Sequence, residues 1–278
     1  LLARGGGSSQ CGQTVGECIV LDYSKYQNKI LEFNAKEKFV WVEPGIVLDQ
    51  LNEYLKPHGL WFPVDVSTSS RATIGGMTGN NSCGSRSLYY GNMVNNVLAV
   101  ESILDDGSIH TFENIDKNYL SKTNDQNRKF QIIKKCIDIR EQVENEINEH
   151  WPKTQRRVGG YNIGLINPNG FNASNILVGS EGTLSLFNKI KLKLSEIPKK
   201  KILGVCYFEK FHEAMTLTRE MVKLKPTTVE LMDKNLLDLA KEIPIYADGI
   251  KKYVIGNPKA VLMVEFIDND LNLINKKI

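Results

Sequence analysis

The sequence of 278 residues is 41% hydrophobic, 24% charged and 8% aromatic, with a formal net charge of +3. This composition is typical of a globular chain of one or two domains and excludes a disordered or collagen-like protein. The small net charge argues against nucleic acid as a partner, and no apolar run approaches the roughly 18 residues of a membrane span. The five cysteines form no Cys-x-x-Cys pair. They indicate reduced thiols in a cytoplasmic protein, and neither a zinc nor an iron-sulfur site.

The first part of the chain combines glycine-rich loops with short elements. A loop at residues 4–9 is followed by two runs of β-forming residues, 18–22 and 39–42, which predict strands separated by a polar connection. Leucines at helical spacing predict an amphipathic helix over residues 48–55, and a proline and a glycine end it. A second glycine-rich segment, residues 73–84, follows an irregular stretch.

The middle of the chain has clear periodicity. Residues 97–104 predict a strand, which an Asp-Gly turn folds into a hairpin with residues 109–112. Apolar positions from about residue 124 to residue 150 predict a long surface helix. A third glycine segment, residues 176–184, leads into residues 190–194, where isoleucine and leucine alternate with lysine. That alternation predicts a half-buried strand.

Pro198 and the three lysines after it form the best candidate domain boundary. Beyond it the pattern predicts a strand at 202–208, a helix at 211–224, a helix around 236–239 and a strand at 260–266. This order is typical of an α+β domain with a ferredoxin-like layer of helices on an antiparallel sheet. The pattern stops before such a domain would be complete.

The segments at residues 4–9 and 73–84 together predict a phosphate slot. Glycine permits positive φ and a close approach of the backbone, so clustered N–H groups form an anion nest, to which serine, threonine and asparagine add hydrogen bonds. The sequence contains no G-x-x-x-x-G-K-[ST], and neither segment is a clean G-x-G-x-x-G that opens a long amphipathic helix. A P-loop and a Rossmann site are therefore disfavoured.

Three segments in this order and spacing resemble one family. They are residues 4–9 with Gln13, residues 63–91, and residues 179–184, and they are similar to the FAD-linked oxidases of the vanillyl-alcohol oxidase type. Residues 228–233 resemble the Glu-Leu-Met-Asp segment at the start of that family's cap domain. Within the family, the chain looks most like the bacterial FAD-linked dehydrogenases of 2-hydroxy acids, including long forms that carry an added iron-sulfur half.

The resemblance implies the domain organisation and the cofactor. We expect a PCMH-type FAD-binding domain of two α+β subdomains over residues 1–198, lacking its N-terminal part, and an incomplete substrate (cap) domain over residues 199–278. The residues that would bind FAD are Arg4, Gly5, Gly6, Gly7, Ser8, Ser9, Gln13, Pro63, Ser69, Thr73, Gly75, Gly76, Gly79, Asn80, Asn81, Gly84, Tyr90, Gly91, Tyr161, Gly182 and Thr183. The first loop would hold the pyrophosphate, the second segment would follow the flavin and ribityl groups, and the third would lie near the adenine.

Several of these assignments have structural alternatives. The serines of the first loop fit ordinary turn chemistry, the third segment fits a tight turn between buried strands, and Tyr161 fits a purely structural role. We expect Glu181 to brace its loop and not to touch the ligand. Relatives that tether FAD use a histidine at the position of Ser8, so we predict noncovalent FAD. Cys11 and Cys83 are the alternative tethers, although free cysteine is commonly a small buried hydrophobe.

No catalytic residue or metal ligand is assigned from this sequence. The Gly-Asp-Gly-Asn-x-His pattern that the resembling 2-hydroxy acid enzymes use for metal binding and proton removal does not occur here. The four histidines have no partner at ligand spacing. They are His58, His110, His150 and His212. We therefore expect the natural protein to continue beyond both ends of this sequence, with its active-site half after Ile278.

Three functions follow as hypotheses. The leading one is an FAD-dependent dehydrogenase that transfers a hydride from a small 2-hydroxy acid such as D-lactate, glycolate or D-2-hydroxyglutarate to FAD. Electrons would pass to an acceptor outside this chain, with an iron-sulfur module as one candidate. The alternatives are the same fold acting on another alcohol or sugar substrate, and a truncated flavin-binding fragment without turnover. The expected location is the cytoplasm, with peripheral attachment to the inner membrane left open.

Overall fold

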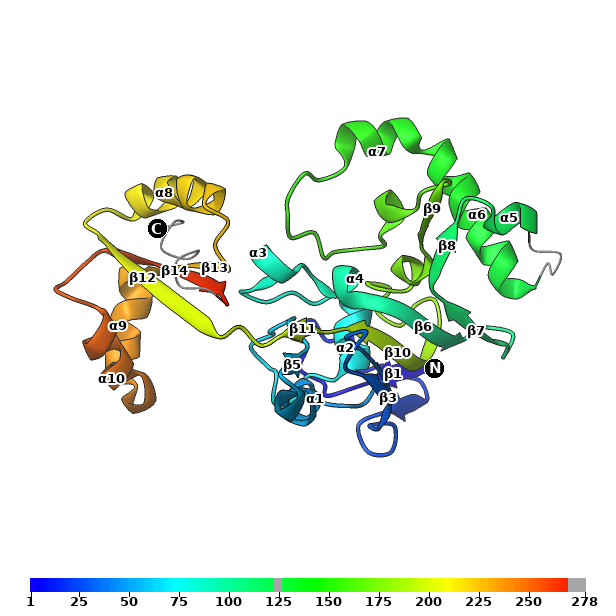
Figure 1. The fold of residues 1–278 in the computed structure, drawn as a ribbon, viewed down its shortest axis with the longest axis horizontal. Helices are drawn as coiled ribbons and strands as arrows, with labels where there is room; N and C mark the ends of the chain where they lie inside the picture. Colours follow the sequence, from blue (N-terminus) through cyan, green and yellow to red (C-terminus); the bar gives the residue numbers. More distant parts are fainter. Residues whose placement is uncertain (123–126, 270–278) are drawn as a thin grey trace. The chain divides into compact units, whose positions relative to one another are not determined.

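The computed structural model describes residues 1–122 and 127–269, and Figure 1 shows their helices and strands. The chain forms two compact units. The first contains residues 1–84 and 91–197, and the second contains residues 85–90 together with the chain from residue 198. The short segment 85–90 therefore packs with the second unit although it interrupts the sequence of the first. The assignment of residues 1–198 and 199–278 to two functional domains stays a prediction.

The central sheet of the first unit has five antiparallel strands in the order β3-β4-β10-β6-β7. The strands are β3 (Ile30–Asn34), β4 (Phe39–Val42), β6 (Val97–Ile103), β7 (Ile109–Phe112) and β10 (Leu186–Lys193). In β10 the side chains of Ile190 and Leu192 are fully buried, and Lys191 between them is not. The half-buried strand that the lysine alternation predicts is thereby confirmed.

Three short strand pairs complete the first unit. They are β1 (Leu2–Arg4) with β2 (Val20–Asp22), β5 (Leu60–Trp61) with β11 (Ser195–Glu196), and β8 (Asn114–Asp116) with β9 (Gly170–Asn172). The first pair is parallel and the other two are antiparallel. Just past the parallel pair, the Tyr23 N–H donates to the Arg4 carbonyl at 2.9 Å. The first glycine loop follows β1 and Tyr23 follows β2, so these two segments begin next to each other.

The helices of the first unit differ in how closely they follow the sequence pattern. They are α1 (Leu48–Leu55), α2 (Ile74–Gly79), α4 (Met93–Asn96), α5 (Tyr119–Lys122), α6 (Arg128–Gln142) and α7 (Glu144–His150), with 3-10 turns at Lys56–His58, Ile163–Leu165 and Ala173–Ile176. Helix α1 buries Leu48, Leu51 and Leu55, as its spacing predicts. The long helix expected to start at residue 124 is two helices that meet at Val143, whose φ of -109° is not helical. Its predicted first residues, 124–126, lie outside the described residues.

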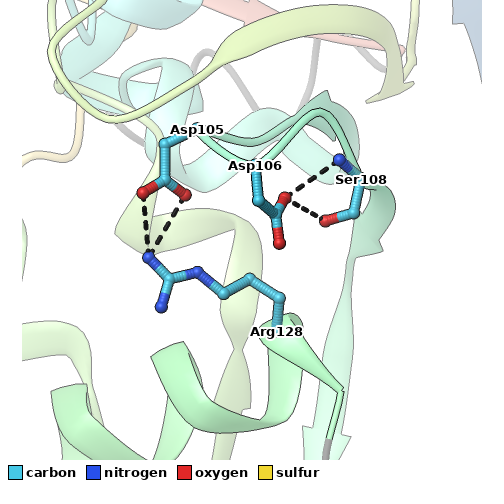
Figure 2. Close-up of polar contacts among 4 residues, drawn as sticks. All are labelled: Asp105, Asp106, Ser108 and Arg128. Atoms are coloured by element: carbon cyan, nitrogen blue, oxygen red, sulfur yellow. Dashed lines mark hydrogen bonds and ion pairs between the residues drawn. The ribbon is translucent and has the colours of Figure 1, made fainter.

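The predicted hairpin at the Asp-Gly turn is confirmed, because β6 and β7 pair in register on either side of it. Figure 2 shows Asp106 in this turn accepting from the Ser108 N–H at 2.9 Å and from its hydroxyl at 2.6 Å. These two bonds lower the pKa of the Asp106 carboxyl. The Arg128 guanidinium at the start of α6 reaches both oxygens of Asp105, at 3.0 and 3.2 Å. The Arg128 side chain thus links α6 to the β6–β7 hairpin.

The second unit is a three-stranded antiparallel sheet in the order β12-β14-β13, with helices on both faces. Its elements are α3 (Ser87–Tyr90), β12 (Lys200–Phe208), α8 (Phe211–Lys223), β13 (Thr228–Asp233), α9 (Lys234–Glu242), α10 (Pro244–Tyr253) and β14 (Ala260–Asp268). Met221 of α8 packs against one face, where Leu262 of β14 points, and Leu237 of α9 packs on the face of Val261. Because β12 and β13 are both antiparallel to β14, they are parallel to each other, and α8 connects them as a split β-α-β unit.

The α+β class is confirmed, and several elements differ from the expectations from sequence, among them β3, α2 and α10. The polar connection between the first two predicted strands contains β3, which pairs with β4. The second glycine segment begins as the helix α2, and α10 follows α9 where no helix was expected. Helix α2 forms despite its glycines because Ile74, Met77 and Thr78 are buried and the Thr73 side chain caps it. Tertiary packing outweighs local propensity there.

Candidate functional site

A cavity of about 350 Å³ lies in the first unit, where the three glycine-rich segments meet. This volume lies in the usual range for small-molecule and cofactor sites, about 300 to 1,000 Å³. Its lining residues are Ala3, Arg4, Gly5, Gly6, Gly7, Ser8, Ser9, Gln13, Thr14, Tyr23, Pro44, Val66, Ser67, Thr68, Ala72, Thr73, Gly75, Gly76, Met77, Gly79, Asn80, Ser82, Cys83, Val158, Glu181, Gly182, Ser185 and Phe187.

The first loop packs tightly against the residues just before α2. A Cβ on Gly5 would lie 2.0 Å from Thr73 Oγ1, and a Cβ on Gly6 would lie 2.1 Å from the Arg71 carbonyl oxygen. Both distances are far shorter than a van der Waals contact. Glycine at these two positions therefore lets two segments of the chain come together. Gly7, with φ of +62°, then turns the loop in a conformation that favours glycine.

The unpaired N–H groups of the first loop indicate that the cavity binds an anionic ligand. Within the described chain, no acceptor receives a hydrogen bond from the backbone N–H of Gly5, Gly6, Gly7 or Ser8. The Arg4 guanidinium lies beside them, since a Cβ on Gly7 would be 3.0 Å from Arg4 Nη2. Unpaired donors beside a cation bind phosphate oxygens well.

Helix α2 forms the adjoining wall. Its first turn is fixed by the Gly75 N–H, which donates to the Pro44 carbonyl at 2.7 Å, and by the Gly76 N–H, which donates to Thr73 Oγ1 at 3.3 Å. A Cβ on Gly75 would lie 2.5 Å from that of Pro44, whereas a Cβ on Gly76 would meet only Thr73 Oγ1, at 3.3 Å. At Gly79 the nearest atom would be 3.8 Å away. Gly76 and Gly79 thus keep this wall free of side chains on the cavity side.

The third segment is hydrogen-bonded to the end of α2. The Gly179 N–H donates to the Thr78 carbonyl and the Glu181 N–H to the Gly79 carbonyl, both at 2.9 Å. Gly179, Glu181 and Gly182 all have positive φ, at 84°, 50° and 77°. The three glycine-rich segments therefore form one connected wall, with α2 in the middle.

Two polar side-chain atoms in the wall are buried without a partner. Gln13 Oε1 and Ser185 Oγ belong to residues that line the cavity, and neither has a hydrogen-bond partner in the described chain. Buried polar atoms are nearly always paired, so such atoms beside a cavity indicate that a ligand completes them. An oxygen acceptor and a hydroxyl suit a ligand with hydroxyl and amide groups as well as phosphates.

Comparisons with protein families identify the ligand class. A family model described as "FAD binding domain" matches residues 1–113, and one described as "FAD linked oxidases, C-terminal domain" matches residues 197–277. The chain thus carries an FAD binding domain and the C-terminal domain of the FAD-linked oxidases, and these domains indicate FAD as the cofactor. The unpaired donors of the first loop and the two unpaired polar atoms of the cavity fit that dinucleotide.

Curated relatives show which FAD-linked enzymes the chain resembles. The chain is 34% identical to a D-2-hydroxyglutarate dehydrogenase of Haemophilus influenzae and 31% identical to that of Escherichia coli, over 99% of this chain in both cases. It is 27% identical to the mitochondrial D-lactate dehydrogenase [cytochrome] of Arabidopsis thaliana, over 97% of this chain. The chain spans 28% of the length of the first two proteins and 38% of the third.

Solved structures support the fold. An alkyldihydroxyacetonephosphate synthase superposes with a TM-score of 0.66 over 99% of this chain and 44% of its own, at 17% identity. At that identity the likeness concerns the fold alone. It agrees with a PCMH-type FAD-binding domain followed by the C-terminal domain of the FAD-linked oxidases.

The structure brings most of the residues expected to bind FAD to the cavity. Those that line it are Arg4, Gly5, Gly6, Gly7, Ser8, Ser9, Gln13, Thr73, Gly75, Gly76, Gly79, Asn80 and Gly182. Those of the first unit that do not are Pro63, Ser69, Asn81, Gly84, Gly91, Tyr161 and Thr183. Tyr90 belongs to the second unit, in α3, beside the Arg86–Glu265 ion pair of that unit.

The residues outside the cavity lining have structural contacts of their own. Asn81 is fully buried and accepts from the Val94 N–H at 3.0 Å, which positions α4. A Cβ on Gly84 would lie 2.1 Å from the Asp65 carbonyl oxygen. Tyr161 is 53% exposed, and its hydroxyl is 2.9 Å from Thr183 Oγ1. These glycines and polar side chains hold the segments that carry the cavity.

Sequence reasoning did not name several wall residues. Tyr23 directly follows the strand β2, Pro44 lies two residues past the end of β4, and Val158, Ser185 and Phe187 come from later segments. Burial raises the pKa of the Tyr23 phenol. For Tyr23 and Pro44 the sequence offered one signal, which was their position just past a predicted strand, because residues at strand ends commonly line a binding site. Ser185 and Phe187 have no such signal, since only the fold brings them near the first loop.

The cavity lining contains one cysteine, and the described residues include no metal-holding cluster. All five cysteines are free thiols, and Cys83 lines the cavity whereas Cys11 is exposed and outside the lining. Across residues 1–122 and 127–269, no group of three or more histidine, cysteine or acidic side chains is arranged to hold a metal ion. Over the same ranges, none of the helices has the length and apolarity needed to cross a membrane.

Proposed function

We propose that this chain belongs to an FAD-linked dehydrogenase that oxidises a 2-hydroxy acid such as D-2-hydroxyglutarate, D-lactate or glycolate. The proposal that the chain binds FAD rests on the cavity, where the first loop presents unpaired N–H groups. The substrate class rests on the names of the relatives, which are D-2-hydroxyglutarate and D-lactate dehydrogenases. The domain extents 1–198 and 199–278 belong to the same proposal.

The chain's own residues would hold the cofactor in a defined way. The N–H groups of Gly5, Gly6, Gly7 and Ser8 would donate to the pyrophosphate beside the Arg4 guanidinium. Each charge-assisted hydrogen bond of this kind contributes about 1.5 to 3 kcal/mol, which offsets the hydration that the phosphates lose. The bare wall at α2 would let the dinucleotide lie against the backbone. We propose the thirteen expected residues that line the cavity as cofactor-binding residues.

The chemistry that bound FAD supplies is acceptance of a hydride from the hydroxyl-bearing carbon of the substrate, which becomes a 2-oxo acid. Proton removal from the substrate hydroxyl needs a base within hydrogen-bond reach. We assign no residue of this chain to that step. Ser8 has no nitrogen or sulfur with which to tether a flavin, so the proposed attachment is noncovalent.

Titration of the purified chain with FAD tests the cofactor part. We expect one FAD per chain, with the yellow chromophore released into the supernatant when the protein is precipitated with acid. FMN should bind more weakly, because it lacks the second phosphate and the adenosine. A chain that retains no flavin absorbance, or that binds FMN and FAD equally weakly, contradicts the proposal. Chromophore that stays in the acid pellet contradicts noncovalent attachment.

Anaerobic reduction of the flavin tests the substrate part. The protein encoded by the complete reading frame around this sequence should lose its flavin absorbance with D-2-hydroxyglutarate, D-lactate or glycolate. Sugar alcohols and aldonolactones serve as the comparison, since the same fold could act on them. Bleaching by one of those compounds and by none of the three hydroxy acids would contradict the proposed substrate class and leave FAD binding intact.

We also propose that an electron acceptor outside this chain, such as an iron-sulfur module, reoxidises the flavin, and that the protein works in the cytoplasm. The spacing of the five cysteines supports an external acceptor, because none of it matches a cluster motif. Their free thiols agree with a reducing compartment. Reoxidation kinetics with artificial acceptors and with a purified iron-sulfur protein would compare the two routes.

A further inference from the structure

Glu181 occupies a backbone conformation that does not favour it. Its φ is 50°, in the left-handed region, between Gly179 at 84° and Gly182 at 77°. Non-glycine residues are uncommon there, and those found are most often asparagine or aspartate. Glycine at position 181 would suit the loop better. An unfavourable conformation of this kind indicates that the side chain has a role of its own.

The side chain of Glu181 does not stabilise the loop. The bond to the Gly79 carbonyl comes from the Glu181 backbone N–H, which any residue would provide. Within the described chain, the carboxylate has no hydrogen-bond or ion-pair partner, and the residue is exposed. The expectation that Glu181 braces its loop therefore holds for the backbone alone.

The carboxylate borders the cavity at some distance from the phosphate nest. Glu181 is the single acidic residue among the described residues that line the cavity. The first loop contacts Thr73 at the start of α2, and Glu181 is bonded to Gly79 at its end. At about 1.5 Å per residue, the six residues from Thr73 to Gly79 separate these two points by about 9 Å. At that separation the carboxylate would not face the phosphates directly.

We propose that Glu181 accepts hydrogen bonds from sugar hydroxyl groups of the bound dinucleotide. An ionised carboxylate only accepts, so its partner must be a donor. In FAD, both sides of the pyrophosphate carry hydroxyls, the ribose on one and the ribityl chain on the other. A carboxylate one short helix away from the phosphates meets such a group on either side. This inference rests on the FAD part of the proposed function.

The test compares Glu181→Gly and Glu181→Gln with the unchanged full chain. Glu181→Gly relieves the backbone and removes the carboxylate, so the melting temperature without FAD should stay equal or rise by a few degrees. The Kd for FAD should rise about tenfold or more. Glu181→Gln, which keeps one acceptor oxygen, should raise the Kd less. The Kd values for ADP and FMN then tell which sugar is involved, since only the probe that carries the contacted hydroxyl is weakened.

Lys225→Gly is the matched control. Lys225 also has a positive φ of 53°, is exposed, belongs to the second unit and is not among the residues that line the cavity. Its replacement should change the melting temperature in the same direction and leave FAD affinity unchanged. The inference is overturned if Glu181→Gly binds FAD as tightly as the unchanged chain, or if it loses stability and FAD affinity together. An unchanged chain that binds no FAD would instead contradict the proposed function.

Discussion

The first glycine loop and helix α2 form adjoining walls of the same cavity, yet their glycines serve different purposes. In the loop, Gly5 and Gly6 face Thr73 and Arg71 at distances where no side chain fits. In α2, a Cβ on Gly76 would meet a single side-chain oxygen at 3.3 Å. One set of glycines brings chain against chain. The other leaves space for the ligand.

A glycine motif combines two effects, which are close packing of chain segments and open space for a ligand. The loop shows the first effect, and Gly76 of α2 shows the second. Substitution in the loop should damage the fold and the site together, because the two segments must move apart. Substitution of Gly76 or Gly79 in α2 should affect the site and spare the fold, whereas Gly75, whose Cβ would lie 2.5 Å from that of Pro44, resembles the loop glycines. Stability and FAD affinity, measured on the same variants, therefore test the comparison directly.

Gly6→Val is expected to have the largest effect. Its Cβ would lie 2.1 Å from the Arg71 carbonyl oxygen, a backbone atom that cannot turn away. Overpacking of this kind costs about 1 to 3 kcal/mol, and FAD binding should be lost because the N–H groups are displaced. Thermal unfolding and FAD titration measure the two effects.

Gly16→Val is the matched control for that variant, since its Cβ would meet only Cys18 Sγ, at an ordinary 3.5 Å. It lies in the same N-terminal segment and outside the cavity lining. It should keep both stability and FAD affinity. A Gly6→Val protein that is folded and binds FAD normally would show that the first loop is not the phosphate nest.

Gly76→Ala should weaken FAD binding about tenfold without destabilising the protein. Alanine in place of a helical glycine stabilises by about 0.5 to 1 kcal/mol, while the new methyl group takes up space at the cavity wall. Gly249→Ala in α10, where nothing lies within 4 Å of the added Cβ, is the control. It should bring a similar gain in stability with unchanged FAD affinity. Equal affinity in the two variants would place the ligand away from α2.

The same contrast explains what the sequence could predict. The helix α1 and the strand β10 were predictable because Leu48, Leu51 and Leu55, or the alternating Ile190 and Leu192, carry their burial pattern locally. Helix α2 was missed, since its glycines give it poor intrinsic propensity and its stability comes from buried Ile74 and Met77. Strand β3 was missed because β4 is its one partner in the described sheet.

At the site, the residue types were predictable and their roles were less so. Glycine clusters in the right order indicated FAD, and thirteen of the expected residues line the cavity. The reason for Gly5 lies in Thr73, a residue far along the chain, so no local pattern could reveal it. For the same reason Ser185 went unnamed, although its unpaired hydroxyl is among the clearer signs of a ligand.

Thr73→Val should have a moderate effect at the junction of the two walls. The Thr73 hydroxyl caps α2 by accepting from the Gly76 N–H, and loss of such a cap costs about 1 kcal/mol. In a chain of this size that corresponds to a decrease of about 2 to 4 °C in melting temperature. FAD affinity should fall a few-fold. Thr73→Ser keeps the hydroxyl and should restore both values, and failure of this rescue would mean that the methyl group, not the cap, matters.

Tyr161→Phe should have the smallest effect, and its neighbour shows why. The Tyr161 side chain is 53% exposed and outside the cavity lining, so losing its bond to Thr183 should change stability by less than about 0.5 kcal/mol. Asn162 is 4% exposed and donates to the Val178 carbonyl at 2.7 Å. Its replacement by alanine leaves that buried carbonyl without a partner and should cost about 1 to 3 kcal/mol. Tyr161→Phe with FAD affinity reduced tenfold would instead mean that the ligand extends past Gly182 to the tyrosine, because the contact with Thr183 in the described chain does not account for such a loss.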